Sequence, residues 1–304
     1  MSLETDLLID RRRLKRRLLF WRVLAVVAVM VGIAVTVTPK LAMPHDRVAR
    51  LSVTGTITDT NREVEALDNA LKDERIKALV VRINSPGGGV TASEQLHDAI
   101  ARVAARIPVV AVMGDLAASG GYMVAMPARR VFATASTLTG SIGVKLETME
   151  ISGLLAKIGV GSETIASGPL KGQPSLTHPL SEAGREALRG VMLDLYEQFV
   201  AMVAAGRHMD VEKVRNLADG RVFSGRQAVQ AGLVDEIGDE RAARAWLAAN
   251  AAVAETLPVE PLRLPRDSGR LGLLRSAADL LKSVLFQGVV IDGPMALWQP
   301  SAQN

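Results

Sequence analysis

The chain has 304 residues, of which 48% are hydrophobic, and its formal net charge is +4. This is enough apolar material for one sizeable domain with additions. The chain has no cysteine, which excludes disulfides, thiol nucleophiles and cysteine-based metal sites, and no cluster of His, Asp or Glu has metal-ligand spacing. We therefore expect neither a metal nor a cofactor.

The net charge comes from the N-terminus. Residues 1–22 hold seven Lys or Arg and three Asp or Glu, so the rest of the chain sums to zero and nucleic-acid binding is not indicated. Residues 23–39 carry no charge, which is near the lower limit for a membrane span. We predict a basic cytoplasmic segment at 1–22, a transmembrane anchor at 23–39 and a linker at 40–46. A cleaved signal peptide is the alternative, but the long basic preface favours an uncleaved anchor.

Beyond the linker, strand and helix patterns alternate. Strands are predicted at 48–58, 78–84, 107–113, 130–136 and around 160–166. Helices are predicted at 61–72, 92–106, after residue 119, and at 147–158, 181–208, 210–217, 224–231 and 240–250. Repeated β-α-β units imply parallel strands with right-handed crossovers.

The C-terminal segment, residues 251–304, differs in character from the rest. It begins with several prolines and then shows an amphipathic stripe at 271–286. Such a helix could pack on the domain, on another subunit or on the membrane, and packing on the domain is favoured.

Ser119 stands where the predicted strand 107–113 gives way to a helix. Two alanines precede it and two glycines follow it. This setting exposes a hydroxyl at a helix N-terminus, with amide N–H groups directed at whatever the hydroxyl attacks. A serine that merely caps the helix is the alternative.

A glycine-rich turn, Pro86-Gly-Gly-Gly89, follows the predicted strand 78–84 and precedes a helix. Such a turn leaves backbone N–H groups unshielded and could bind an anion. Phosphate is disfavoured, because no Gly-Lys-Ser/Thr closes the loop and the spacing is not the dinucleotide pattern. We expect an oxyanion hole beside Ser119.

A serine nucleophile needs a base. Of the four histidines, only His178 lies where it could serve. A desolvated lysine is the other option, and Lys171 lies in a loop punctuated by glycine and proline. Loop histidines and lysines are more often solvated surface groups, so the residues alone leave the base open.

Four motifs occur in order: Asn84–Gly89, Ala117–Tyr122, Thr139–Val144 and Ser167–Lys171. With their spacing they resemble the signal peptide peptidase A family, single-unit bacterial Ser–Lys membrane proteases, over roughly residues 47–249. The resemblance implies a Clp-protease/crotonase-like α/β domain at 47–250. It also implies Ser119 as nucleophile, Lys171 as general base, and Gly88 and Gly120 as oxyanion-hole donors. The Gly-Pro-Leu before the lysine departs from the more polar approach usual in the family.

Two other residues compete for these roles. Lys145 is the second choice as base, since the family's lysine falls in the later loop. Asp115 could complete a triad, but a strand-end aspartate more often caps a helix, and a Ser–Lys dyad needs no carboxylate. The chain also resembles, more distantly, the proteolytic subunit of the Clp protease. That relative has a histidine in the neighbourhood that Val144 and Lys145 occupy here. A Ser–His–Asp enzyme is therefore disfavoured.

Resemblance and topology together imply a serine endopeptidase anchored in the bacterial cytoplasmic membrane, with its catalytic domain on the outer, periplasmic face. Its expected substrates are remnant signal peptides and other apolar peptides. Its expected partners are membrane lipid and copies of itself, in a homo-oligomer, an octamer by resemblance, whose sites could be shared between subunits. Two other classes stay open: a catalytically silent membrane scaffold and a crotonase-type acyl-CoA enzyme.

Overall fold

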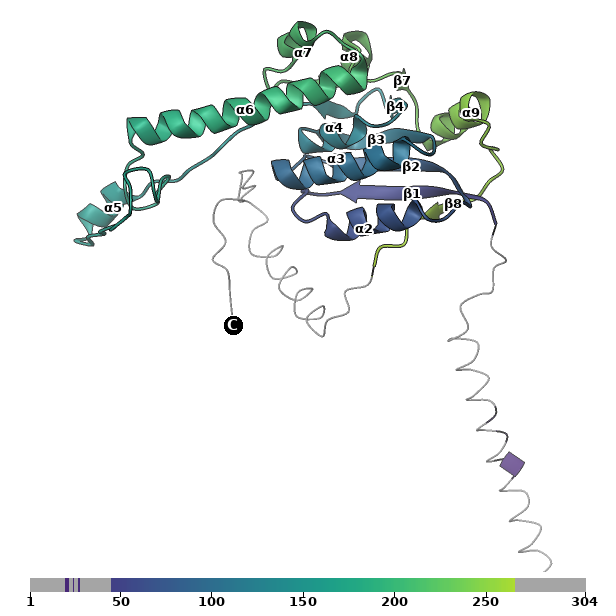
Figure 1. Ribbon diagram of the computed structural model, residues 1–304, viewed down its shortest axis with the longest axis horizontal. Coiled ribbons are helices and arrows are strands. Elements are labelled where there is room, and N and C mark those ends of the chain that lie inside the picture. The colour runs from purple at the N-terminus through teal and green to yellow at the C-terminus, as the bar shows by residue number, and fades with distance from the viewer. Residues whose placement is uncertain (1–19, 22–23, 25–26, 28–44, 266–304) are drawn as a thin grey trace, which may run out of the picture. The chain divides into compact units, whose positions relative to one another are not determined.

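A computed structural model describes residues 20–21, 24, 27 and 45–265 (Figure 1). The rings of Phe20 and Trp21 meet edge to face, with centroids 6.1 Å apart. In the described part of the chain, no helix has the length and apolarity to cross a bilayer. Apart from residues 24 and 27, the predicted anchor 23–39 lies outside the described residues, as does the predicted helix at 271–286.

From residue 46 onward, the described chain forms one unit around an eight-stranded sheet. The strands are β1 Arg47–Thr54, β2 Ile76–Ser85, β3 Val109–Ala118, β4 Arg130–Ala133, β5 Leu138–Gly140, β6 Val222–Ser224, β7 Glu236–Ile237 and β8 Val259–Pro261. Their order is β6-β5-β3-β2-β1-β8, with β4 beside β3 and β7 beside β4. Strands β5 and β6 pair antiparallel, and the other described pairs are parallel. The predicted mixed α/β fold with parallel β-α-β units is confirmed.

Helices cover both faces of this sheet (Figure 1). They are α2 Asn61–Ala70, α3 Val90–Ala104, α4 Gly120–Ala125, α5 Ser152–Lys157, α6 Glu182–Arg207, α7 Val211–Leu217, α8 Gly225–Ala231 and α9 Glu240–Ala251. Alternate strand positions face opposite cores: Leu51 and Val81 lie in the larger one, with α2, α3, α4 and α6, whereas Val80 and Val112 lie in a smaller one with α9. Because both faces are buried there, β2 and β3 contain uninterrupted apolar runs, at 78–81 and 109–113.

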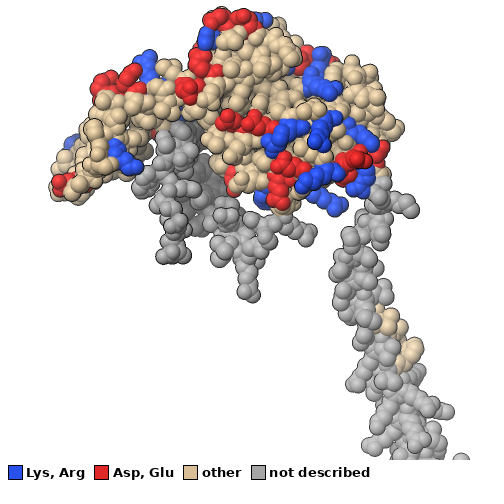
Figure 2. All heavy atoms as spheres, in the orientation of Figure 1, with Lys and Arg blue, Asp and Glu red and all other residues tan. Residues whose placement is uncertain are grey.

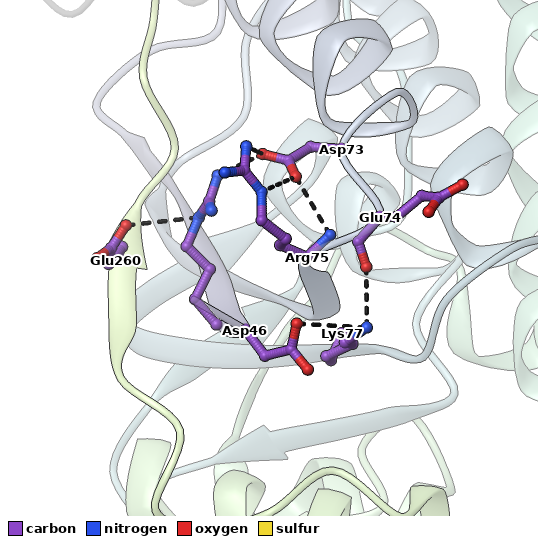
Figure 3. Close-up of polar contacts among 7 residues, drawn as sticks. Asp46, Asp73, Glu74, Arg75, Lys77 and Glu260 are labelled. Carbon is purple, nitrogen blue, oxygen red and sulfur yellow. Dashed lines mark hydrogen bonds and ion pairs between the residues drawn. The ribbon is translucent and has the colours of Figure 1, made fainter. Parts of the chain in front are cut away.

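Charged side chains fasten the N-terminal ends of β1 and β2 to the edge strand β8 (Figure 3). Asp73 accepts hydrogen bonds from Arg75 and Arg47, each at 2.7 Å, and Arg47 also pairs with Glu260 of β8 at 3.4 Å. The hydrogen bonds from Arg75, above all, hold the pKa of Asp73 well below its usual range. The network joins three neighbouring strands of the sheet at one end.

Three predicted elements differ most from the structure; the predicted strands 48–58 and 130–136 also end early, at Thr54 and Ala133. The strand expected to end at residue 113 continues to Ala118, because β5 pairs with residues 116–118. The helix expected from residue 147 begins only at Ser152. The strand expected at 160–166 is wrong: these residues are exposed and form no ladder, because no other strand runs beside them. They belong to residues 145–181, termed the arm, which includes α5. In Figure 1, α5 lies near the end of α6 that projects beyond the sheet.

Candidate active site

Ser119 occupies a strained turn between β3 and α4. Its φ of 54° and ψ of −122° lie in a region that residues with a Cβ rarely adopt. It stands at the N-cap position of α4, yet its side chain accepts no hydrogen bond from the helix. Capping therefore does not account for this serine. A strained serine between a strand and a helix is the arrangement that exposes the hydroxyl of a nucleophile elbow.

Hydrogen bonds on both sides hold this strained backbone in place. The amide of Ser119 donates to the carbonyl of Gly140, at the end of β5, at 2.9 Å. The carbonyl of Ser119 accepts from the amides of Tyr122 and Met123 at 2.9 and 3.0 Å. Pairing with β5 thus fixes the direction in which the chain leaves β3, and the first turn of α4 fixes the next peptide.

The glycine-rich turn after β2 presses against this elbow. A Cβ on Gly87, whose φ is +99°, would lie 2.6 Å from the amide nitrogen of Gly120, and a Cβ on Gly88 would lie 2.1 Å from the carbonyl oxygen of Ile57. Only glycine fits at either position. Among the described residues, no acceptor is found for the amides of Gly88 and Gly120. Both N–H groups are therefore available to an oxyanion.

A small pocket opens beside Ser119. Its lining consists of Gly88, Val90, Ser93, Ser119, Gly120, Met123, Gly143, Val144 and Phe199. The structure thus brings together three of the four residues expected at the site. Within the described residues, none that lines this pocket is titratable. The described part of the chain supplies two hydroxyls, those of Ser93 and Ser119, and two amides here, but no titratable base.

Lys171, the expected base, lies elsewhere. It is exposed in the arm and lines a separate hollow with Gln173, Ser175 and His178, which shares no residue with the pocket at Ser119. In Figure 1 the arm follows the projecting end of α6, away from α4. Within a single described chain, Ser119 and Lys171 are not brought together.

The rival candidates also stay outside the pocket. Lys145 is exposed and pairs with Glu147 at 3.0 Å. Asp115 is exposed within β3 and, among the described contacts, does not cap α4. His178 lies within hydrogen-bond distance of Thr177, with 3.0 Å between its Nδ1 and the threonine Oγ1. None of the three lines the pocket at Ser119.

Three pocket residues, Val90, Ser93 and Phe199, come from helices whose part in the site the sequence did not reveal. Ser93 of α3 is buried, and its hydroxyl donates to the carbonyl of Gly89 at 2.9 Å. Phe199 of α6 is 2% exposed. The available signal was the position of Ser93, one helical turn after the glycine-rich turn.

A partly buried ion pair joins α6 to the segment before β7, and a hydrogen bond ties α4 to the same segment. Arg207, at the end of α6, donates to both carboxylate oxygens of Asp235 at 2.7 and 2.8 Å, and Tyr122 of α4 donates to the carbonyl of Leu233 at 2.7 Å. Burial alone would raise the pKa of Asp235, but the hydrogen bonds and positive charge of Arg207 outweigh it and lower that pKa. Burial raises the pKa of Tyr122 above its usual value, so the phenol remains a donor.

The sequence matches two family models. Peptidase family S49 matches residues 101–254, about half of the chain, and Clp protease matches residues 32–139. Together the two matches cover β1 to β7, including both strands that lead into the pocket.

Similar proteins are named as proteases. A protein of Synechocystis sp. named as a protease is 42% identical over 66% of this chain and 73% of its own length. A protein of Enterococcus faecium named as signal peptide peptidase SppA is 39% identical over 64% of this chain and 60% of its own length. The chloroplastic serine protease SPPA of Arabidopsis thaliana is 36% identical over 62% of this chain and 28% of its own length. The chain belongs to peptidase family S49 and is a serine protease of the SppA type.

Proposed function

We propose that this protein is a Ser–Lys endopeptidase whose active site is completed by a second copy of the chain. Ser119 is the nucleophile, Lys171 of the neighbouring copy is the general base, and the amides of Gly88 and Gly120 bind the oxyanion. The observation that carries the proposal is a strained serine whose side chain does not cap the helix. It stands beside two amides for which no acceptor is found among the described residues. Because the pocket lining lacks a base within that part of the chain, the base must come from outside it.

The chemistry is acyl transfer through a serine ester. The neutral amine of Lys171 accepts the hydroxyl proton as the oxygen of Ser119 attacks a peptide carbonyl, and the two amides bind the tetrahedral oxyanion. The resulting ammonium protonates the leaving amine. Water then cleaves the acyl-enzyme and regenerates the serine. Since the base works as a free amine, we expect activity to rise toward alkaline pH.

The surface of the arm supports contact with another copy. It exposes large apolar side chains: Met149, Leu154, Ile158, Val160, Ile165, Leu170 and Leu176, with Ile165 95% exposed. Exposed apolar clusters of this kind mark interaction sites. A head-to-tail contact repeated around a ring would bring each arm to its neighbour's pocket. The octamer implied by the family resemblance is one such ring.

Apolar peptides are the proposed substrates. Val90, Met123 and Phe199 give the pocket an apolar lining beside the nucleophile, which favours an apolar side chain next to the scissile bond. The uncharged segment 23–39 is proposed to anchor the enzyme, so that the domain faces the outer side of the cytoplasmic membrane. Remnant signal peptides are apolar and are released at that membrane, so they suit both features.

Cleavage of a synthetic signal peptide by detergent-solubilised protein tests the assignment. Ser119→Ala and Lys171→Ala should each lower kcat by at least about 1000-fold, because each removes a group that acts in the transition state. Lys145→Ala is the matched control and should retain activity. Full activity of Lys171→Ala would refute the dyad, and loss in Lys145→Ala alone would move the base to Lys145.

A further inference from the structure

We infer that Ser85 is a positioning residue for the oxyanion hole, because its buried hydroxyl fixes the turn that presents the Gly88 amide. The inference rests on the proposed roles of Ser119 and Gly88. Ser85 is fully buried and does not line the pocket, so it acts through the turn and not on the substrate.

The hydroxyl of Ser85 joins two chain segments. It donates to the carbonyl of Gly55, just after β1, at 2.7 Å, and it accepts from the amide of Gly87 at 3.0 Å. A hydroxyl can do both at once, since it carries one proton and two lone pairs. An alanine could do neither.

The other side of the turn is held by Ile57. Its amide donates to the carbonyl of Gly87 at 2.9 Å, and its carbonyl accepts from the amide of Gly89 at 2.8 Å. Of three consecutive turn amides, the first is therefore bound to Ser85 and the third to Ile57. The middle amide, that of Gly88, is left at the pocket.

Ser85 also touches the elbow that carries the nucleophile. A Cβ on Gly121 would lie 2.7 Å from the carbonyl oxygen of Ser85 and 3.3 Å from its Cβ. The register between β2 and β3 shifts between Ile83 and Ser85, which pair with Met113 and Ala117. One residue thus contacts both structures that supply oxyanion donors, the turn with Gly88 and the helix start with Gly120.

Ser85→Ala should therefore weaken the binding of the transition state more than the binding of the substrate. The Gly87 amide and the Gly55 carbonyl would lose their partner in a buried place, and the turn would shift to recover hydrogen bonds. Small misplacements of a catalytic donor cost one to two orders of magnitude in rate, so we expect kcat to fall about 10- to 100-fold while KM changes less than about twofold.

The test measures kcat and KM on a synthetic signal peptide, and Ki for a peptide aldehyde whose hemiacetal oxygen occupies the oxyanion hole. All values are normalised to the sites labelled by a fluorophosphonate. In Ser85→Ala, Ki should rise by about the same factor as kcat falls. Ser85→Cys keeps a weak donor and acceptor and should lie between Ser85→Ala and the wild type. The control is Thr60→Val, because the buried hydroxyl of Thr60 donates to the carbonyl of Ala92 at 3.2 Å outside the pocket lining.

A purely structural role would reduce the number of labelled sites but leave kcat and Ki per site unchanged, and that result would overturn the inference. Should Ser85→Ala not fold, wild-type kcat and Ki in Ser85→Cys would overturn it equally. Activity that persists in Ser119→Ala would instead refute the proposed function, so the two failures are distinguishable.

Discussion

At the scale of single residues, adjacent glycines of the turn have different surroundings. A Cβ on Gly88 would lie 2.1 Å from the carbonyl oxygen of Ile57, whereas a Cβ on Gly89 would meet nothing closer than 3.8 Å. Gly88→Ala should therefore displace the turn, lower kcat at least about 100-fold and cost about 1–3 kcal/mol of stability. Gly89→Ala, the control one residue away, should keep most of its activity. Comparable kinetics in the two variants would contradict the oxyanion-hole geometry.

The position of the candidate site could be predicted at this scale, but its strain could not. Ser119 and the glycine-rich turn follow neighbouring parallel strands, and their ends meet at the same edge of a sheet. The positive φ of Ser119 depends on Gly140 and Gly87, which are distant in sequence. The role of Ser85 could not be predicted for the same reason, since its partner Gly55 is 30 residues away in the sequence. The catalytic roles themselves remain predictions.

At the scale of elements, the Arg207–Asp235 pair joins the end of α6 to the segment before β7. The pKa of Asp235 is lowered in the fold, so its stabilisation is present above the unfolded value of about 3.9 and is lost as pH falls through the folded value. Asp235→Asn would leave the charge of the mostly buried Arg207 guanidinium uncompensated, although the carbonyl of Gly232 would still accept from it, and should cost about 3 kcal/mol at pH 7. Urea unfolding should show that the difference in unfolding free energy between the wild type and Asp235→Asn is smaller at pH 3 than at pH 7.

The control for that measurement is Asp68→Asn, which breaks the exposed pair with Arg102. Exposed pairs contribute about 0–1 kcal/mol, so this change should be small. A gap between wild type and Asp235→Asn that stays constant from pH 7 to pH 3 would show that the charge of Asp235 does not carry the stabilisation.

The strands predicted best are those with a stretch buried on both faces, such as 78–81 within the predicted strand 78–84, because a continuous apolar run marks them directly. Residues 160–166 are also apolar in part, yet they are exposed in the arm. A strand exists only where a partner offers hydrogen bonds, and local composition carries no information about that partner. Strands β5 and β6 are three residues each, too short for a periodic signal.

Exposed apolar residues of the arm give a further prediction. Ile158 and Ile165 are 64% and 95% exposed, so replacing both with serine should leave the unfolding free energy of one chain within about 0.5 kcal/mol. If the arm docks on a second copy, the double variant should lose both assembly and peptidase activity. Val211→Ser, an exposed apolar position on α7, is the control and should assemble normally. Assembly is measured by sedimentation and activity by peptide cleavage. A double variant that assembles and is active would contradict the arm's role.

At the scale of the whole molecule, the candidate catalytic groups lie in two separate places on one chain. The pocket at Ser119 lies at the carboxyl-terminal end of β3, and Lys171 lies in the arm. If a neighbouring copy supplies the base, as proposed, the enzyme is active only as an assembly, and its activity is coupled to oligomerisation. Dilution below the dissociation constant should therefore silence it without unfolding the domain.

Complementation between two inactive variants tests the shared site most directly. Ser119→Ala and Lys171→Ala chains, each inactive alone, are dissociated, mixed in equal amounts and reassembled. A site formed by the serine of one chain and the lysine of the next should recover about a quarter of wild-type activity, the fraction expected for random neighbours in a ring. Mixed assemblies with no activity, formed under conditions in which separated and reassembled wild-type chains regain theirs, would contradict a dyad divided between neighbouring chains.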